Sequence, residues 1–147
     1  MFAAEFARLW MKITKEWKAH LDEALAPALT ESQLNVLELL LEHQPMKPSD
    51  MLQYLSTTPA AITTLLDRME RGGLIARTRD ETDRRIVWVT ATERGAREAR
   101  RGVEIRERYI QQALDRISAH NQQLLIYLLG KIAGEAKAHS AAAGDGR

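Results

Sequence analysis

The segment TTPAAITTLLDRMERGGLIARTRDETDRRIVWVT, residues 57–90, combines a helical pattern with a strand-turn-strand pattern. Its first half has helical spacing, with Thr58-Pro59 at the start and Gly72-Gly73 at the end. These dipeptides are typical of an N-cap followed by proline in the first turn, and of a glycine C-cap. Its second half holds two short strand-like runs, 74–79 and 86–90, on either side of a polar, turn-prone hexapeptide. The stretch therefore predicts a helix followed by a β-hairpin with a charged tip.

Two helices are predicted upstream of this stretch. Thr30-Glu31-Ser32-Gln33 has the pattern of a capping box and opens a helix that stops before Pro45. A short helix over residues 48–55 begins with proline, and Ser56-Thr57-Thr58 separates it from the next helix. Two helices joined by a three-residue break and followed by a hairpin have the order of a winged helix-turn-helix. We therefore expect such a lobe over residues 30–95.

Apolar helices flank the lobe. Residues 2–26 have an apolar stripe at helical spacing that ends at Pro27. A long helix is predicted from an N-cap at Thr90 or Thr92 to about residue 117. Ser118 then caps a last helix with a broad apolar stripe.

The predicted fold class is mostly α with a small β-hairpin wing. The chain is expected to form a single domain over residues 1–147. Within it, the winged helix-turn-helix is flanked by N- and C-terminal dimerisation helices at 1–26 and 96–139. The small, polar residues 140–147 are expected to be a disordered tail.

The composition is that of an ordinary folded protein, with 147 residues, 45% hydrophobic and 28% charged. The absence of cysteine excludes disulfides, thiolate catalysis and direct thiol redox sensing. Glu5 and Arg8 interrupt the first apolar run, which argues against a signal peptide, and no apolar run is long enough to cross a bilayer. We therefore expect a cytoplasmic protein without membrane contact.

The charge is uneven along the chain. The net charge is only +1, yet ten arginines and six acidic residues lie between Arg68 and Arg101, which gives this stretch +4. Arginine is suited to phosphate and base-edge contacts. A solvated surface with helical ion pairs is the alternative explanation of this pattern when charge is considered alone.

Catalytic and metal sites are not predicted. The four histidines lie far apart in sequence, and none pairs with another histidine or a carboxylate at metal-ligand spacing. There is no nucleophile elbow and no glycine-rich phosphate loop. We expect no enzyme activity, no metal and no cofactor.

The helix after the break and the hairpin tip carry the residue types that DNA reading requires. Small and hydroxylated side chains allow close approach to bases, and arginine suits a narrow minor groove. The predicted DNA contacts are Thr57, Thr58, Ala60, Ala61, Thr63, Thr64 and Arg68 on the helix, and Arg84 and Arg85 on the wing. An ordinary solvated surface is the alternative for each of these residues alone.

The run LTESQLNVLELL, followed by PSDMLQYLSTTPAAITTLLDRMERGGLIARTRDETDRRIVWVTATERG, resembles the MarR family of bacterial winged helix-turn-helix transcriptional regulators. The most specific parts are LLDRMERGGLIART, DETDRR and TERG, and the resemblance covers residues 30–95. It implies a homodimer held by the terminal helices, with the 59–72 helix in the major groove. It also implies that Asp83 orients Arg85 into the minor groove. Family members that sense oxidants through cysteine differ from this chain, which has none.

The terminal helices expose more apolar surface than a small winged domain covers, which favours a two-fold interface. The predicted interface residues are Phe2, Phe6, Leu124, Leu125, Leu128 and Ile132. Packing within one chain is the alternative. The resemblance also implies a pocket for a small-molecule effector, for which Trp10, Trp17, His20 and Tyr109 are candidates. Core packing is the alternative for each of these four.

The predicted function is therefore that of a dimeric, sequence-specific DNA-binding regulator of transcription. We expect a repressor that binds a near-palindromic operator in double-stranded DNA and is relieved by a small ligand. The alternative is a winged-helix module for protein–protein contact that does not read DNA sequence.

Overall fold

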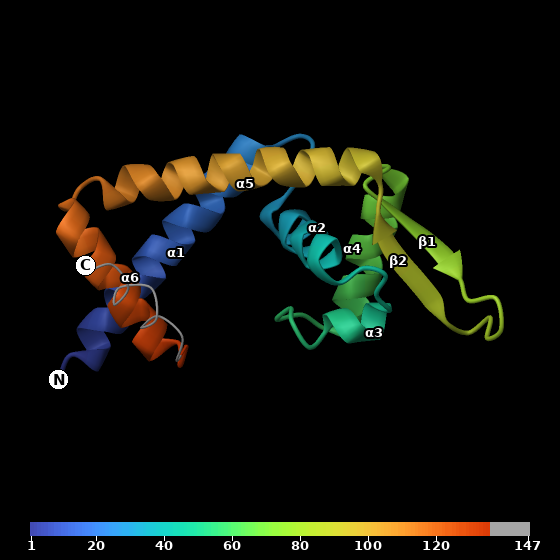
Figure 1. Cartoon of the computed structure of the whole chain (residues 1–147), viewed down its shortest axis with the longest axis horizontal. Coiled ribbons are helices and arrows are strands. Elements are labelled where there is room, and N and C mark those ends of the chain that lie inside the picture. Colours follow the sequence, from blue (N-terminus) through green and yellow to red (C-terminus); the bar gives the residue numbers. More distant parts are fainter. Residues whose placement is uncertain (136–147) are drawn as a thin grey trace, which may run out of the picture. The chain divides into compact units, whose positions relative to one another are not determined.

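The computed structural model describes residues 1–135 (Figure 1). The tail predicted at 140–147 lies outside the described residues. The chain divides into two compact units, residues 1–106 and residues from 107 onward, and each is considered by itself. The elements in chain order are α1 (Ala3–Leu25), α2 (Glu31–His43), α3 (Pro48–Met51), α4 (Pro59–Arg71), β1 (Ile75–Arg79), β2 (Val87–Ala91), α5 (Glu93–Leu114) and α6 (Ala119–Ile132). The predicted order of elements is confirmed.

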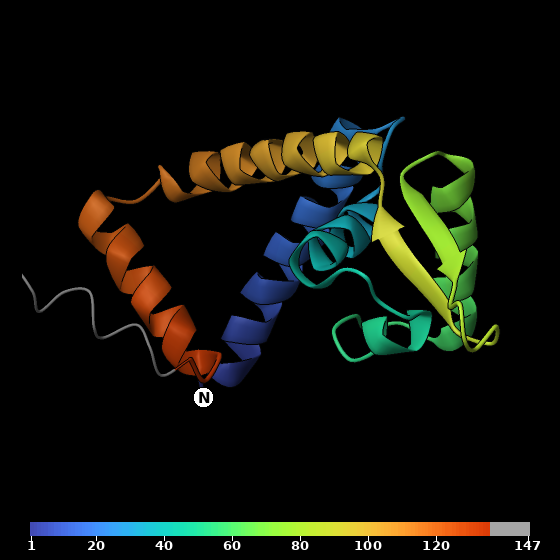
Figure 2. The same ribbon diagram turned by 45° about the vertical axis from the view of Figure 1, so that its right-hand side comes forward.

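The core of residues 1–106 is a single apolar cluster. It joins the end of α1, most of α2, the inner face of α4 and the hairpin. Leu34, Leu37, Leu66 and Val89 in this cluster are fully buried. Figure 2 shows the hairpin lying along α4, which places the two predicted DNA-contacting elements side by side. The cluster fixes the two elements on one scaffold.

Two glycines of α5 allow this helix to approach the core. A Cβ atom on Gly95 would clash with the carbonyl oxygen of Leu74, and one on Gly102 would lie 2.8 Å from a methyl carbon of Leu34. Only glycine fits at Gly95 without a backbone shift, since the obstructing atom belongs to the main chain.

The ends of α4 follow the predicted signals. The Thr58 Oγ1 accepts a hydrogen bond from the Ala61 N–H at 3.2 Å. At the other end, Gly73 has a φ of 74°. The Leu74 N–H donates to the Met69 carbonyl at 2.9 Å, and the Gly73 N–H donates to the Glu70 carbonyl at 3.0 Å. These two bonds form a Schellman motif, so the glycine C-cap is confirmed.

The hairpin pairs β1 with β2 in antiparallel register, from Ile75 opposite Ala91 to Arg79 opposite Val87. Met46 adds a backbone bridge on the other side of β2. Its N–H donates to the Val89 carbonyl at 3.1 Å and its carbonyl accepts from the Val89 N–H at 2.8 Å. The wing is therefore tied to the segment that precedes α3.

Three predicted helix ends need correction. The short third helix ends at Met51, and the residues that follow form turns in which the Tyr54 N–H bonds the Met51 carbonyl three residues back. Helix α5 ends at Leu114, because the Ile117 N–H likewise reaches back three residues. Such bonds belong to tight turns and do not continue an α-helix.

The last helix ends at Ile132, well before residue 139. Gly134 has a φ of 75°, and the Glu135 N–H donates to the Gly130 carbonyl at 2.9 Å. This is a second Schellman motif, and it stops α6 as Gly73 stops α4.

Helix α6 begins with the predicted cap, in which the Ser118 Oγ accepts from the Asn121 N–H at 3.2 Å. None of its residues is buried. All the predicted interface residues are exposed in the single chain: Phe2, Phe6, Leu124, Leu125, Leu128 and Ile132. Among the residues that the structure describes, no helix has the length and apolarity needed to span a membrane.

Candidate nucleic-acid interface

Helix α4 has an inner face that is buried and an outer face that is exposed. Ile62, Leu66 and Met69 are buried, and the predicted phase of the helix is therefore confirmed. All five predicted contacts within the helix are exposed: Ala60, Ala61, Thr63, Thr64 and Arg68. Four of these five side chains are small, so the backbone of α4 can come close to a flat or grooved partner.

The threonine hydroxyls on this outer face are already oriented. The Thr63 Oγ1 donates to the Pro59 carbonyl at 2.9 Å, and the Thr64 Oγ1 donates to the Ala60 carbonyl at 3.2 Å. Because the hydroxyl protons are used within the helix, the oxygen lone pairs are what remain available. These two residues can accept hydrogen bonds from a partner, and their methyl groups are free for apolar contact.

Thr57 and Thr58 occupy positions different from those of the other predicted contacts. Thr58 is the N-cap, and its side chain is engaged with Ala61. Thr57 lies in the loop before the helix, half-buried, and its N–H donates to the Leu55 carbonyl at 2.9 Å. Both residues thus shape the start of α4, whereas Thr63 and Thr64 stand on its outer face.

Arg77 of β1 clamps the wing to α4. Its Nη2 lies 2.7 Å from Asp67 Oδ1 and 3.0 Å from Glu70 Oε1, and its Nε donates to Glu70 Oε2 at 3.1 Å. The Glu70 hydrogen bond is the largest cause of a raised pKa at Arg77, and the same bond lowers the pKa of Glu70. In the sequence, Arg77 is only one of the ten arginines between Arg68 and Arg101. Its role depends on acids from another element and has no local signal.

The wing tip presents a charged pair. The Asp83 carboxylate accepts from the Arg85 Nε and Nη2, each at 3.0 Å, and from the Arg85 backbone N–H at 3.1 Å. The Arg85 side chain is 91% exposed. This contact lowers the pKa of Asp83 and raises the pKa of Arg85. The geometry agrees with the predicted pairing, in which the carboxylate restricts the arginine rotamer and leaves the guanidinium accessible.

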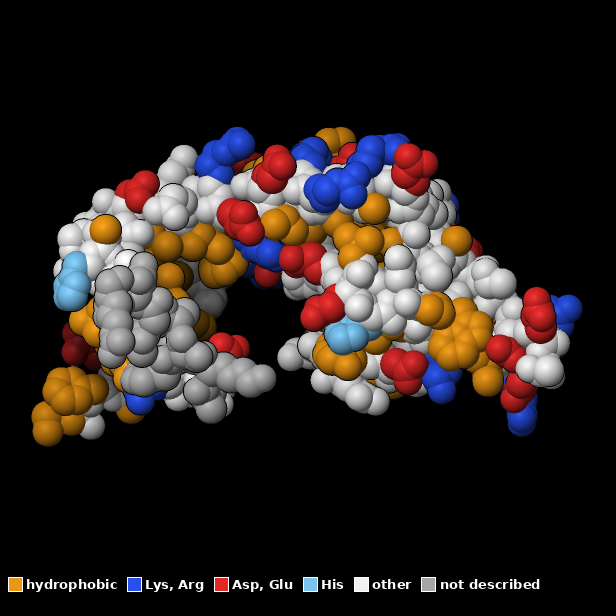
Figure 3. Space-filling model, viewed as in Figure 1, with side chains coloured by type: hydrophobic (Ala, Val, Ile, Leu, Met, Phe, Trp, Pro, Cys, Tyr) orange, Lys and Arg blue, Asp and Glu red, His pale blue; other side chains and the backbone are white. Residues whose placement is uncertain are grey.

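Asp80, at the base of the tip, was missed as a site residue. One of its carboxylate oxygens accepts from the Trp88 Nε1 at 3.0 Å, and the other accepts from the Thr82 and Asp83 backbone N–H groups. The Trp88 bond is the largest cause of the strongly lowered pKa of Asp80. An aspartate that opens a polar turn is a recognisable local signal. The bond to Trp88 depends on strand pairing, so it has no local signal in the sequence. Figure 3 shows the acidic and basic side chains that gather at this end of the hairpin.

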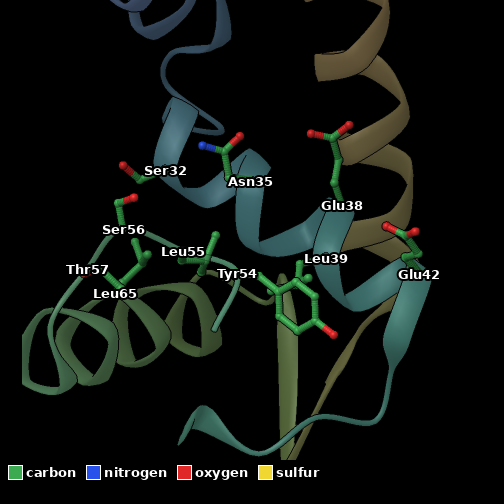
Figure 4. A pocket seen from close by; sticks show the side chains of 10 residues that line it. All are labelled: Ser32, Asn35, Glu38, Leu39, Glu42, Tyr54, Leu55, Ser56, Thr57 and Leu65. Atoms are coloured by element: carbon green, nitrogen blue, oxygen red, sulfur yellow. The ribbon is translucent and has the colours of Figure 1, made fainter. Parts of the chain in front are cut away.

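A cavity of about 650 Å³ lies between α2 and the loop before α4 (Figure 4). Three leucines and seven polar side chains line it: Ser32, Asn35, Glu38, Leu39, Glu42, Tyr54, Leu55, Ser56, Thr57 and Leu65. One wall is held by an ion pair in which Arg106 binds both carboxylate oxygens of Glu38, at 2.6 and 2.7 Å. Its volume is within the range of small-molecule sites, but its lining is more polar than is usual for them.

The predicted ligand pocket residues lie elsewhere. Trp10, Trp17 and His20 are on α1, and Trp17 packs against the apolar core. Tyr109 is on the part of α5 that belongs to the second unit. None of the four lines the cavity of Figure 4, and the pocket that they were expected to form stays a prediction. Within residues 1–135, no group of three histidine, aspartate or glutamate side chains is arranged to hold a metal ion.

Comparison with known proteins decides the family. A sequence profile of the MarR family matches residues 29–87. YwhA of Bacillus subtilis (strain 168), an uncharacterized HTH-type transcriptional regulator, is 30% identical over 125 residues, which are 84% of this chain and 87% of that protein. The chain belongs to the MarR family.

Other proteins with more specific descriptions are also similar. The HTH-type transcriptional repressor MdtR of Bacillus subtilis is 33% identical over 87 residues, 59% of this chain and 54% of that protein. A crystal structure of an Escherichia coli MarR mutant complexed with operator DNA is 26% identical. It superposes with a TM-score of 0.73 and covers 90% of this chain and 97% of that one. The winged helix-turn-helix fold predicted from the sequence is therefore confirmed, as is the resemblance.

Proposed function

We propose that this chain is a homodimeric, sequence-specific DNA-binding repressor of transcription that acts in the cytoplasm. In this proposal, residues 30–95 form the DNA-binding lobe, and residues 1–26 and 96–139 carry the dimer interface. The partner is a near-palindromic operator in double-stranded DNA. No cofactor, metal or membrane takes part, and no reaction is catalysed.

The outer face of α4 is the observation that carries this proposal. It exposes small and hydroxylated side chains at Ala60, Ala61, Thr63 and Thr64, and the Arg77 clamp holds the wing beside it. Thr63 and Thr64 accept hydrogen bonds from the exocyclic amino groups of adenine or cytosine, and their methyl groups contact thymine. Arg85 enters the adjacent minor groove, where the electrostatic potential is most negative. The MarR–operator complex with the same fold supports this arrangement.

The exposed apolar residues of α1 and α6 support the dimer. Phe2 is 78% exposed and Ile132 is 69% exposed in the single chain. Monomeric proteins rarely expose so many large apolar side chains together. Two recognition helices related by a two-fold axis reach half-sites about 10 base pairs apart, centre to centre. An operator with two-fold symmetry follows.

Selection of bound sequences from a random duplex library tests the function directly. We expect enrichment of a near-palindromic site, with gel-shift affinity that falls steeply as salt increases. A footprint that covers only one half-site, or binding without sequence preference, would contradict the proposal. In the latter case a protein–protein role would be the better explanation.

Thr63→Ala and Thr64→Ala test the reading face. Each is expected to relax preference at one base pair and to cost about 1–3 kcal/mol of binding free energy. Thr14→Ala is the matched control, because the Thr14 hydroxyl also donates to a carbonyl four residues back, at Trp10, but lies on α1. Equal effects of the three substitutions would refute the assignment of this face.

Relief by a small-molecule ligand is the remaining part of the proposal. Two places deserve separate tests, the aromatic set Trp10, Trp17, His20 and Tyr109, and the cavity beside Thr57. Trp17→Phe and Tyr54→Phe, compared in the presence of a ligand found by thermal-shift screening, would distinguish the two sites. A ligand that binds wild type but leaves operator affinity unchanged would contradict relief.

A further inference from the structure

The Asp80 carboxylate is a four-way acceptor at the base of the wing tip. Oδ1 accepts from the Trp88 Nε1 at 3.0 Å. Oδ2 accepts from the Thr82 N–H at 3.1 Å, the Thr82 Oγ1 at 2.8 Å and the Asp83 N–H at 2.9 Å. A side chain in β2 and two successive residues of the tip are thus held by one carboxylate.

These contacts continue to the arginine at the tip. Trp88 sits in the paired part of β2, opposite Thr78. Asp80 joins this tryptophan to the backbone of Asp83, and the Asp83 carboxylate in turn grips the Arg85 guanidinium. Around the same turn, the Asp80 N–H donates to the Ile86 carbonyl at 2.9 Å. The hydrogen bonds form an unbroken series from the sheet to Arg85.

We infer that Asp80 is the residue that positions Arg85 for DNA, acting through Asp83 and anchored on the Trp88 indole. It does not touch DNA itself. Its carboxylate fixes the backbone on which the Asp83–Arg85 pair stands, so the arginine reaches the duplex with its direction set in advance. This inference rests on the proposed DNA binding.

Both oxygens of the Asp80 side chain are needed for this role. Asparagine has nearly the same shape, but it offers one acceptor oxygen and an NH₂ group that only donates. In Asp80→Asn the NH₂ group must face either the Trp88 N–H or the two backbone N–H groups of the tip. One set of bonds is therefore lost in either orientation.

Electrostatics alone predicts the opposite result, which makes the substitution informative. Removing a negative charge from a DNA-facing wing should tighten binding. Glu81→Gln is the matched control, since Glu81 is the adjacent acid on the same turn and its exposed side chain makes no hydrogen bond or ion pair in the described residues. If Asp80 positions Arg85, Asp80→Asn weakens operator binding by about three- to tenfold, the loss expected when one side chain must be immobilised on binding. Glu81→Gln then leaves affinity unchanged or slightly tighter.

The Arg85→Ala background separates positioning from a general effect on folding. There, Asp80→Asn should cause no further loss of affinity, and thermal unfolding should shift little in either background. Weakening of the same size with and without Arg85, or binding as tight as that of Glu81→Gln, would overturn the inference.

Amide hydrogen exchange in the absence of DNA tests the hydrogen bonds of Asp80 independently of the proposed function. The Thr82 and Asp83 amides should exchange faster in Asp80→Asn and also, more weakly, in Trp88→Phe, with the core amides of Leu37 and Val89 unchanged. Unchanged protection of Thr82 and Asp83 in Asp80→Asn would overturn the inference. If the wild-type protein bound no duplex, the DNA-binding proposal would fail, while this measurement would still decide whether Asp80 orders the tip.

Discussion

The apolar core within residues 1–106 and helix α6 differ in how far their apolar side chains are shielded from solvent. The first region closes a core in which Leu34, Leu37 and Leu66 are fully shielded from solvent. In contrast, α6 carries an equally apolar sequence and buries none of its residues. Leu125, its least exposed large side chain among those above, is still 38% exposed. The winged lobe therefore buries its apolar side chains within the chain, together with the end of α1 and part of α5, whereas the apolar side chains of α6 stay open to another surface. In the proposed dimer that surface belongs to a second copy.

The largest expected effect comes from placing a charge on α6. Leu125→Asp or Leu128→Asp would put a carboxylate into the proposed interface, at a cost of several kcal/mol. We expect a monomer by analytical ultracentrifugation. Operator affinity should fall by about a hundredfold or more, because two linked half-site contacts become one.

Gln123→Asp is the control for these substitutions. Gln123 lies about 160° around the helix from Leu125, given 3.6 residues per turn. Gln123→Asp therefore introduces the same charge on the opposite side of the same helix. It should leave the dimer intact. A soluble dimer of Leu125→Asp with wild-type operator affinity would place this face outside the interface.

The next effect concerns the closed core. Gly95→Ala would bring a methyl group into a clash with the Leu74 carbonyl oxygen and within 3.1 Å of a Leu37 methyl carbon. Overpacking of this kind typically costs about 1–3 kcal/mol of unfolding free energy, and a backbone obstacle favours the upper end. Urea denaturation should show a lower midpoint with an unchanged m-value. Stability equal to wild type would mean that α5 approaches the hairpin less closely than described.

The features that could be predicted from the sequence are those decided within a few residues. The Thr30–Gln33 capping box, the Thr58 and Ser118 caps and the Gly73 C-cap all formed as expected. Each couples a side chain or a backbone conformation to the nearest helical turn, so its signal is local. Gly134 shows the limit of reading such signals, since the same motif there ended α6 earlier than the apolar stripe indicated.

Several of the contacts that were missed join residues distant in sequence. Glu38 and Arg106 are 68 positions apart, and Gln44 accepts from the Ala91 N–H across 47. The Arg77 clamp likewise requires a strand and a helix to be placed first. Neither spacing nor composition encodes these pairings, because they depend on how the elements pack. The candidate reading face of α4 was accessible from sequence, while the supports that hold the wing beside it were not.

A smaller effect, on operator binding, is expected from substitutions at the wing tip. The tip contributes little to the core but carries residues proposed to contact DNA. Arg85→Ala should weaken operator binding and reduce the salt dependence by about one phosphate contact. Asp83→Ala should also weaken binding, by about 0.5–1.5 kcal/mol, because Arg85 must then be immobilised on binding. A purely electrostatic view predicts tighter binding by Asp83→Ala.

The double-mutant cycle decides between these views. In the Arg85→Ala background, Asp83→Ala should have little further effect, since coupled residues are not additive. Fluorescence anisotropy with a labelled operator at two salt concentrations measures both the operator affinity and its salt dependence. Tighter binding by Asp83→Ala, or equal losses in both backgrounds, would leave Asp83 as an ordinary turn residue.

The smallest effect is expected on α6, from a glycine-to-alanine substitution that matches the one at Gly95. A Cβ atom on Gly130 would meet no described atom within 4 Å. Replacing a helical glycine by alanine lowers the entropic cost of folding by about 0.5–1 kcal/mol. Gly130→Ala should therefore raise the melting temperature slightly, whereas Gly95→Ala lowers it. Gly130 also lies about 140° from Leu125 around the helix, so the dimer dissociation constant should stay unchanged. A weaker dimer of Gly130→Ala would show that the partner surface extends around α6 to this side, and the uncovered face would then be wider than the leucine stripe.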